Sequence, residues 1–357
     1  MMIYKRENRD VTDTLLWLLK NRASVVERSL GYELAARQYM ALERISRMSG
    51  REDMGDDALY RAGNSLLLAG KYRESLDLLG RAEGEAAKNG SEKALAAICQ
   101  VQSANLRMMG QYQEAISSID RAIDIQERLG DIQAVLKYQN NKGLILWRMG
   151  EQEEALGCYK ISLDNARKSG DQAAESNCLN NIGLIYQDQE RLDEALSCHL
   201  RALELRRPLK DLGLIISSLI NAGNTLVQLE KLGEGERLWE EAMVLSQKMG
   251  DFASLAMLKH NRADLRYRRG EHLEALSLFR KALDIKRELG LRSYLASSMM
   301  GIAKTLYGLR RGKDDLQESR RLANEITEMQ ESGRKYREEA ADLLGMLNEY
   351  ESNEKGG

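Results

Sequence analysis

The sequence predicts an all-α solenoid, a linear stack of helical hairpins in which each unit contacts only its neighbours. Two observations indicate this fold class. The composition favours long uninterrupted helices, because the 357 residues include one proline and two phenylalanines. Glycines recur at intervals of 40 residues, or a multiple of 40, in two series offset by 20: Gly50, Gly90, Gly130, Gly170, Gly250 and Gly290, and Gly70, Gly110, Gly150 and Gly270. A period of this size predicts one continuous domain of stacked hairpins.

Small residues mark the points where two predicted helices cross closely. One position of the repeat carries Gly63, Gly143, Gly183, Gly223, Ala263 and Ala303. Twelve residues later come Ser75, Ala115, Ala155, Ala195, Gly235 and Ala275, and nineteen residues later Ala82, Ala122, Ser162, Ala202, Ala242 and Ala282. The bulky residues Leu79, Ile119, Tyr159, His199, Trp239 and Phe279 lie sixteen residues after the first series. This alternation predicts interlocking layers.

This spacing resembles the motif of the tetratricopeptide repeat family over about residues 16–312. The 40-residue unit, the Gly-Asp between hairpins and the Asn-Asn-x-Gly of residues 140–143 and 180–183 are most similar to its long-repeat branch. That branch includes cell-polarity adaptors, kinesin light chain and prokaryotic arrays. The resemblance implies a right-handed α-α superhelix of about seven to eight hairpins, with first helices along a concave groove and a C-terminal capping helix.

The predicted elements follow in order along the chain. Residues 1–55 form a divergent N-terminal hairpin, because Ala35 and Tyr39 fall in register with the repeat. Residues 56–331 form about seven 40-residue units, with first helices beginning near residues 56, 96, 136, 176, 216, 256 and 296. Residues 332–350 form the capping helix, since apolar residues recur there at helical spacing. Residues 351–357 form a flexible tail.

The turns between hairpins have a predicted chemistry of their own. A glycine supplies the left-handed conformation that ends a helix, and the aspartate after it, such as Asp131 or Asp171, caps the next helix. The single proline, Pro208, lies where Leu209 and Lys210 replace the usual glycine. We expect a slightly irregular joint there.

Charge and residue content exclude several functions. A net charge of −2 gives no long-range attraction to nucleic acid or an anionic membrane, and no apolar stretch is long enough to span a bilayer. Cys99, Cys158, Cys178 and Cys198 form no metal-binding motif, which favours free thiols in the cytoplasm. His199, His260 and His272 lack a nucleophile arrangement, and no phosphate-binding loop is present. We therefore expect no catalytic residue, metal, cofactor or small-molecule substrate.

The family resemblance places a varied set of side chains on the concave wall. Amide side chains there can hold the backbone of an extended peptide, and Arg and Lys can fix acidic groups. The candidate peptide-binding residues are Arg107, Lys137, Asn140, Trp147, Arg148, Asn177, Asn180, Gln187, Asn224, His260, Tyr267 and Arg268.

Alternatives stay open for several of these positions. Asn141, Asn181, Asn221 and Asn261 recur in register, which favours a structural bond between hairpins. Trp147 suits either packing or peptide contact. His260, Tyr267 and Arg268 form either a second contact cluster or solvated surface.

The main hypothesis is a non-enzymatic adaptor that binds a peptide or extended segment of a partner protein in the groove, as a monomer or weak homo-oligomer. A second hypothesis is a signalling effector resembling bacterial peptide receptors, which carry a separate N-terminal three-helix bundle; residues 11–49 fit one hairpin instead. A third is a self-associating structural protein.

Overall fold

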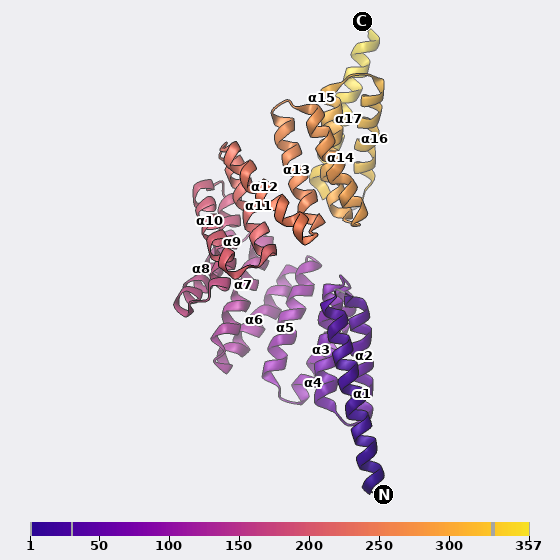
Figure 1. The fold of residues 1–357 in the computed structure, drawn as a ribbon, viewed down its shortest axis with the longest axis vertical. Coiled ribbons are helices and arrows are strands. Elements are labelled where there is room, and N and C mark those ends of the chain that lie inside the picture. Colours follow the sequence, from indigo (N-terminus) through magenta and orange to yellow (C-terminus); the bar gives the residue numbers. More distant parts are fainter. Residues whose placement is uncertain (1, 30, 330–332, 357) are drawn as a thin grey trace. The chain divides into compact units, whose positions relative to one another are not determined.

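The chain is helical throughout the part that the structure, a computed structural model, describes: residues 2–29, 31–329 and 333–356. Seventeen α-helices and one short 3₁₀-helix follow one another there, with no strand among them (Figure 1). The predicted all-α class is confirmed. The predicted segment ends at residues 1, 331, 332 and 357 lie outside the described residues.

The chain divides into two compact units, Met1–Ile185 and Tyr186–Gly357, where the repeat predicted one continuous domain. In a stack, each hairpin contacts mainly its neighbours in the sequence. The first unit contains α1 (Met2–Arg28), α2 (Tyr32–Met48), α3 (Glu52–Leu68), α4 (Tyr72–Lys88), α5 (Glu92–Met108), α6 (Tyr112–Leu129), α7 (Ile132–Met149), α8 (Gln152–Ser169) and most of α9 (Gln172–Asp188).

The second unit begins near the end of α9 and continues the alternation of long helices. It contains α10 (Leu192–Leu209), α11 (Leu212–Gln228), α12 (Leu232–Met249), α13 (Phe252–Arg268), α14 (His272–Glu288), the 3₁₀-helix η1 (Arg292–Tyr294), α15 (Leu295–Leu309), α16 (Lys313–Glu328) and α17 (Gly333–Gly356). The first helices of the repeats start about four residues earlier than predicted, at Glu52, Glu92, Ile132, Gln172, Leu212 and Phe252.

The earlier start follows from the turn chemistry. Gly130 ends α6 with a φ of 70°, and the Asp131 N–H donates back to the Gln126 carbonyl at 3.0 Å. Asp131 Oδ1 then accepts the Ala134 N–H at 3.0 Å, which caps α7. Because one Gly-Asp pair both ends a helix and begins the next, no linker residues separate them.

The joint at Pro208 ends its helix with a left-handed residue, as the neighbouring joints do. Pro208 lies in the last turn of α10, and Lys210 adopts the left-handed conformation with a φ of 58°. The Lys210 N–H donates to the Arg207 carbonyl at 3.2 Å. A lysine thus takes the left-handed position that glycine holds at most joints, as a glutamate does at Glu190 and Glu230.

The close crossings occur where the small residues predict them. A Cβ added to Gly143 would stand 2.9 Å from Tyr159 Cε1, and one added to Gly223 would stand 2.6 Å from Trp239 Cδ1. Ala195, at the next small position of its repeat, is fully buried. The register read from the sequence therefore places the packing positions correctly.

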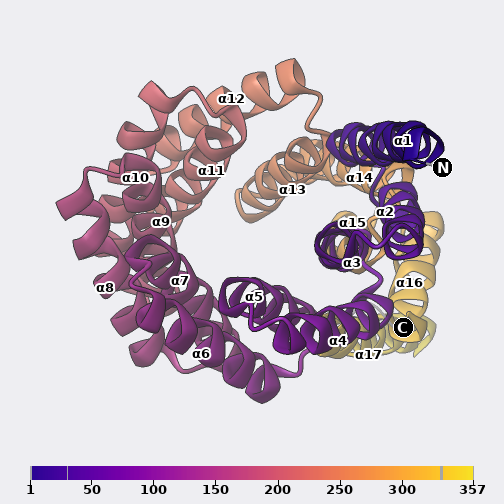
Figure 2. The same cartoon turned by 90° about the horizontal axis from the view of Figure 1, so that it is seen from below.

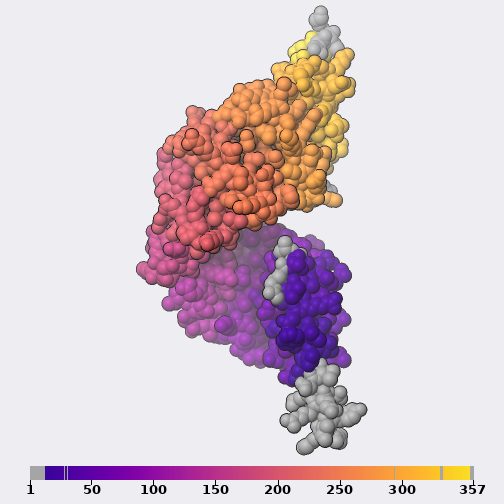
Figure 3. Space-filling view, viewed as in Figure 1, coloured from indigo at the N-terminus to yellow at the C-terminus, as the bar shows by residue number. Residues whose placement is uncertain are grey.

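Each unit has two layers of helices. In Figure 2, α3, α5 and α7 form one layer of the first unit, and α4, α6 and α8 form the other. Likewise, α11, α13 and α15 form one layer of the second unit, and α12, α14 and α16 the other. We call the layer that contains α3, α5, α7, α9, α11, α13 and α15 the first layer. Successive hairpins meet without large openings on the face shown in Figure 3.

The core is a series of local hydrophobic clusters. One joins α1–α5 around Leu16, Tyr39 and Leu79, and another joins α13–α17 around Phe279 and Leu347. The final helix, α17, packs on α15 and α16. It also includes residues 351–356, which the sequence predicted as a flexible tail. An ion pair between Glu351 and Arg320 of α16, at 3.0 Å, joins this segment to the preceding helix.

Candidate functional site

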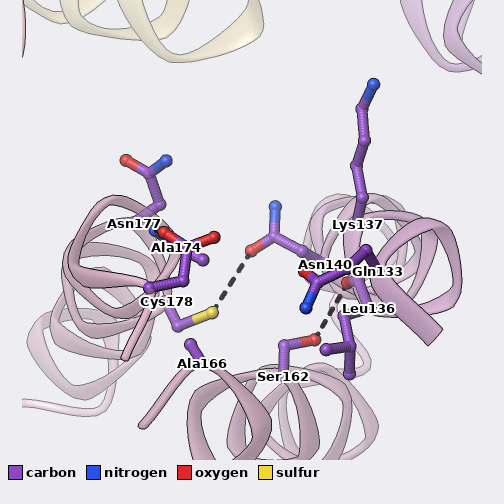
Figure 4. A pocket seen from close by; sticks show the side chains of 10 residues that line it. Gln133, Leu136, Lys137, Asn140, Ser162, Ala166, Ala174, Asn177 and Cys178 are labelled. Atoms are coloured by element: carbon purple, nitrogen blue, oxygen red, sulfur yellow. Dashed lines mark hydrogen bonds between the residues drawn. The ribbon is translucent and has the colours of Figure 1, made fainter. Parts of the chain in front are cut away.

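A cavity of about 320 Å³ lies in the first unit between α7 and α9, with α8 as its floor. It brings together three of the predicted residues, Lys137, Asn140 and Asn177. Figure 4 shows Asn140 directed towards Cys178 across the cavity, while the Lys137 side chain extends away from it. The cavity, called the first cavity below, is lined by Gln133, Leu136, Lys137, Asn140, Ser162, Ala166, Asp171, Ala174, Asn177 and Cys178.

Polar side chains that donate and accept hydrogen bonds line the first cavity together with one carboxylate. Asn140 Oδ1 accepts hydrogen bonds from Asn181 Nδ2 at 3.3 Å and from Cys178 Sγ at 4.0 Å. The Ser162 hydroxyl donates its proton to the Leu136 carbonyl at 3.1 Å, so its free capacity is as an acceptor. The Asp171 carboxylate also lines the cavity. Such a surface suits a ligand that donates hydrogen bonds.

Two arginines of the first layer carry charge that no described carboxylate neutralises through an ion pair. Arg107 of α5 is half-buried, and its pKa is lowered by burial and, further, by the nearby Arg148 cation. Arg148 of α7 is exposed, and its guanidinium carbon lies 5.3 Å from the Trp147 ring centroid. These three predicted residues do not line the first cavity. They provide a separate cationic and aromatic surface near the ends of their helices.

A second cavity of about 210 Å³ lies in the second unit. It brings together four more predicted residues, Gln187, Asn224, His260 and Arg268. The second cavity is lined by Gln187, Asn224, Val227, Gln228, Trp239, His260, Asn261, Asp264, Leu265 and Arg268.

The polar groups of the second cavity are largely paired with one another. Asn224 Oδ1 accepts both Trp239 Nε1 at 3.0 Å and Asn261 Nδ2 at 2.9 Å. Gln187 donates to Gln228 at 2.7 Å, and Arg268 forms an ion pair with Asp264 at 2.7 Å. Asn224, which the sequence placed among the peptide-binding residues, is therefore occupied in holding α12 and α13 to α11.

His260 connects the second cavity to a buried lysine. Its Nδ1 lies 3.3 Å from Ser298 Oγ, and the same oxygen accepts Lys286 Nζ at 2.9 Å. Burial, followed by the Lys286 cation, lowers the pKa of His260 to about 4, and burial lowers the pKa of Lys286 to about 8. Ser298 is fully buried, so this chain of contacts offers no accessible nucleophile.

Two predicted residues take other positions. Tyr267 packs against the C-terminal hydrophobic cluster, with its ring centroid 5.2 Å from that of His272, and so does not form one contact surface with His260 and Arg268. Asn180 is partly buried on α9 and lines neither cavity.

Sequence reasoning missed the floor and the far wall of the first cavity. Ser162 and Ala166 lie on α8, a second-layer helix, and Cys178 was interpreted as architecture alone. Their signal is the small residue Ala166 at a position where three other repeats carry Gln126, Arg206 and Lys286.

The remaining chemistry of the site is limited. No three metal-ligating side chains cluster within the described ranges, and the four cysteines are free thiols. Burial raises the pKa of Cys178 to about 11, which keeps this thiol protonated at neutral pH. Among the described helices, none combines the length and the apolar character needed to cross a membrane.

The helical hairpins, the 40-residue register and the first-layer cavities define a repeat protein of the tetratricopeptide class. The family model for the tetratricopeptide repeat matches residues 102–168, 134–208, 172–248 and 214–288, which together span more than half of the chain. The chain belongs to the tetratricopeptide repeat family.

Solved structures share this fold. The apo form of the quorum sensor NprR from B. thuringiensis is 18% identical, with a TM-score of 0.66 over 90% of this chain and 94% of that one. A Rap protein complexed with competence and sporulation factor is 14% identical, with a TM-score of 0.61 over 95% and 98%. Aspartyl phosphate phosphatase F from Bacillus subtilis is 15% identical, with a TM-score of 0.62 over 82% and 76%. No curated protein matches the sequence.

Proposed function

We propose that this protein is a non-enzymatic cytoplasmic scaffold that binds an extended peptide segment of a partner protein along the first-layer helices of its first unit. The observation that carries the proposal is the first cavity, an open polar site between α7 and α9. Lys137 and Asn177 stand at this cavity, and both can reach an extended chain that passes over it.

The surface around this cavity suits recognition of a peptide rather than catalysis. Arg107, Arg148 and Lys137 form no ion pair with a described carboxylate, so all three can bind acidic groups of a partner. Binding by many shallow contacts on a preformed surface keeps the ordering cost low. Fold likeness to a Rap protein in complex with competence and sporulation factor supports this mode of binding.

The test is a pull-down from source cells with matched charge-removal variants. Lys137→Ala/Arg148→Ala removes two exposed cations from the first layer, and Lys160→Ala/Lys168→Ala removes two exposed cations from α8. We expect a partner that the wild type and the α8 variant capture and that the first-layer variant loses. Equal melting temperatures show that the folding of all three proteins is unaffected, and capture of the same partner by all three would overturn the proposed site.

A second candidate is a peptide-regulated signalling receptor, which the likeness to the quorum sensor NprR favours. The N-terminal region does not supply a separate bundle, because α1 and α2 share a hydrophobic cluster with α3–α5. A receptor of this type should change conformation when it binds its peptide. Hydrogen exchange measured with and without the captured peptide separates the two functions: widespread protection beyond the binding helices favours the receptor, and local protection favours the scaffold.

A further inference from the structure

The first cavity lies at a position of the repeat that a long, buried polar side chain occupies at three other joints. At each joint between two hairpins, a residue near the end of a second-layer helix pairs with the residue twelve positions later, which lies in the next first-layer helix. Three joints pair a long polar side chain with a polar partner: Gln126 with Tyr138, Arg206 with Ser218, and Lys286 with Ser298. At the joint between α8 and α9 the pair is Ala166 and Cys178.

The Arg206 joint shows what this position can hold. The Arg206 side chain is 3% exposed, and its Nη1 donates to Ser218 Oγ at 2.7 Å and to the Leu214 carbonyl at 3.1 Å. Burial lowers the pKa of Arg206, and the nearby Asp211 carboxylate opposes this shift by favouring the charged form. A buried arginine is thus held by a hydroxyl, a main-chain carbonyl and a nearby carboxylate.

The first cavity contains the corresponding partners without the arginine. Asp171 takes the place of Asp211, Ala174 that of Leu214, and Cys178 that of Ser218, each 40 residues earlier. Ala166 stands where Arg206 would be, and its short side chain leaves the space open. The Ser162 hydroxyl adds an acceptor that the Arg206 joint lacks, because Ala202 stands at that position there, whereas Asn140 corresponds to Asn180.

We propose that the first cavity binds the guanidinium side chain of an arginine in the partner peptide, in the manner in which Arg206 is bound by its own chain. This inference rests on the proposed function, because the arginine comes from a peptide that lies along the first layer. The hydrogen-bond acceptors of the first cavity favour a side chain that donates hydrogen bonds, and the Asp171 carboxylate favours a positively charged one. The exposed cation Lys137 extends away from the cavity and leaves it accessible.

The first test supplies the arginine from within the chain. Ala166→Arg places a guanidinium in the cavity, and we expect a higher melting temperature than that of the wild type. Ala86→Arg is the matched control, because Ala86 is also buried but its partner in register is the bulky Ile98. Overpacking should lower the melting temperature of the control. A fall in both variants, or failure of Ala166→Arg to fold, would overturn the proposal.

The second test uses the wild-type protein and a defined probe. N-acetylarginine methylamide is titrated while the amide signals of α7 and α9 are followed by NMR, with N-acetylnorleucine methylamide as the uncharged control. We expect saturable shifts at residues of the first cavity with the arginine probe alone, lost in Ala166→Arg and roughly threefold weaker in binding in Asp171→Asn. The Asp171→Asn variant keeps a side-chain oxygen that can accept the Ala174 N–H, so the cap of α9 is retained. Shifts that are absent, or unchanged in Ala166→Arg, contradict the assignment.

The outcomes distinguish this proposal from the proposed function. A partner that the first layer captures equally well in the wild type and in Ala166→Arg would leave the scaffold function standing and refute the arginine site. Saturable probe binding without any captured partner would refute the scaffold function and leave the arginine site standing.

Discussion

His199 provides a test of how far burial controls the pH dependence of stability. The side chain is fully buried in α10, at the repeat position that Tyr159, Trp239 and Phe279 fill with larger rings. Neither ring nitrogen has a hydrogen-bond partner among the described residues. Burial, followed by the Arg206 cation, lowers the pKa of His199 to about 4 from an ordinary value of 6.5.

The direction of the effect follows from which state binds the proton. As the pH falls below 6.5, His199 takes up a proton in the unfolded chain but not in the folded one, until the pH reaches about 4. The free energy of unfolding therefore falls across this window. At pH 5, one and a half units below the ordinary pKa, the loss due to His199 is about 2 kcal/mol.

The substitution that tests this effect is His199→Phe. The chain already carries a phenylalanine, Phe279, at the same position of another repeat. Urea unfolding is followed by circular dichroism at pH 7.5 and pH 5 for both proteins. We expect the wild type to lose about 2 kcal/mol more than the variant between these pH values. His260 is present in both proteins, so its own contribution cancels. An equal loss in the two proteins would refute the claim that the buried imidazole stays neutral.

Two further substitutions test packing and hydrogen bonding. Gly143→Ala should lower the free energy of unfolding by about 1–3 kcal/mol, because the added methyl meets the Tyr159 ring. Gly157→Ala, in the exposed middle of α8 where an added Cβ meets nothing within 4 Å, should raise the free energy of unfolding by roughly 0.5–1 kcal/mol. Thermal melts should therefore show a lower melting temperature for Gly143→Ala and a higher one for Gly157→Ala. Asn224→Ala should lower the free energy of unfolding by about 1–3 kcal/mol, because the buried Trp239 indole N–H loses its acceptor; an unchanged melting temperature would contradict this role.

The turns and crossings could be predicted from the sequence because each depends on local rules. The Gly130-Asp131 turn depends only on a residue that adopts the left-handed conformation and on a capping carboxylate. The requirement for a small residue at Gly143 follows from the bulky side chain sixteen positions later. Both requirements act between residues close in the sequence. The 40-residue period then repeats them along the array.

The candidate site was only partly predictable, because side-chain partners depend on the geometry between repeats. Lys137, Asn140 and Asn177 line one cavity, since register alone puts them on neighbouring first-layer helices; their role in peptide binding stays a prediction. The hydrogen bond that Asn224 accepts from the Trp239 indole could not be predicted, because it depends on the Trp239 rotamer. The first cavity depends on a side chain that is short, and its signal emerges only when Ala166 is compared with Gln126, Arg206 and Lys286 in register.

The serial arrangement of the core also determines how the chain can fold. The cluster around Leu16 and Tyr39 draws on α1–α5 alone, and the cluster around Phe279 and Leu347 on α13–α17 alone. Contacts between residues close in the sequence need little loop closure, so each group of hairpins can form without waiting for the rest. During synthesis, the N-terminal hairpins can bury their apolar faces while the C-terminal ones are still within the ribosome, which limits the hydrophobic surface exposed to aggregation at any moment.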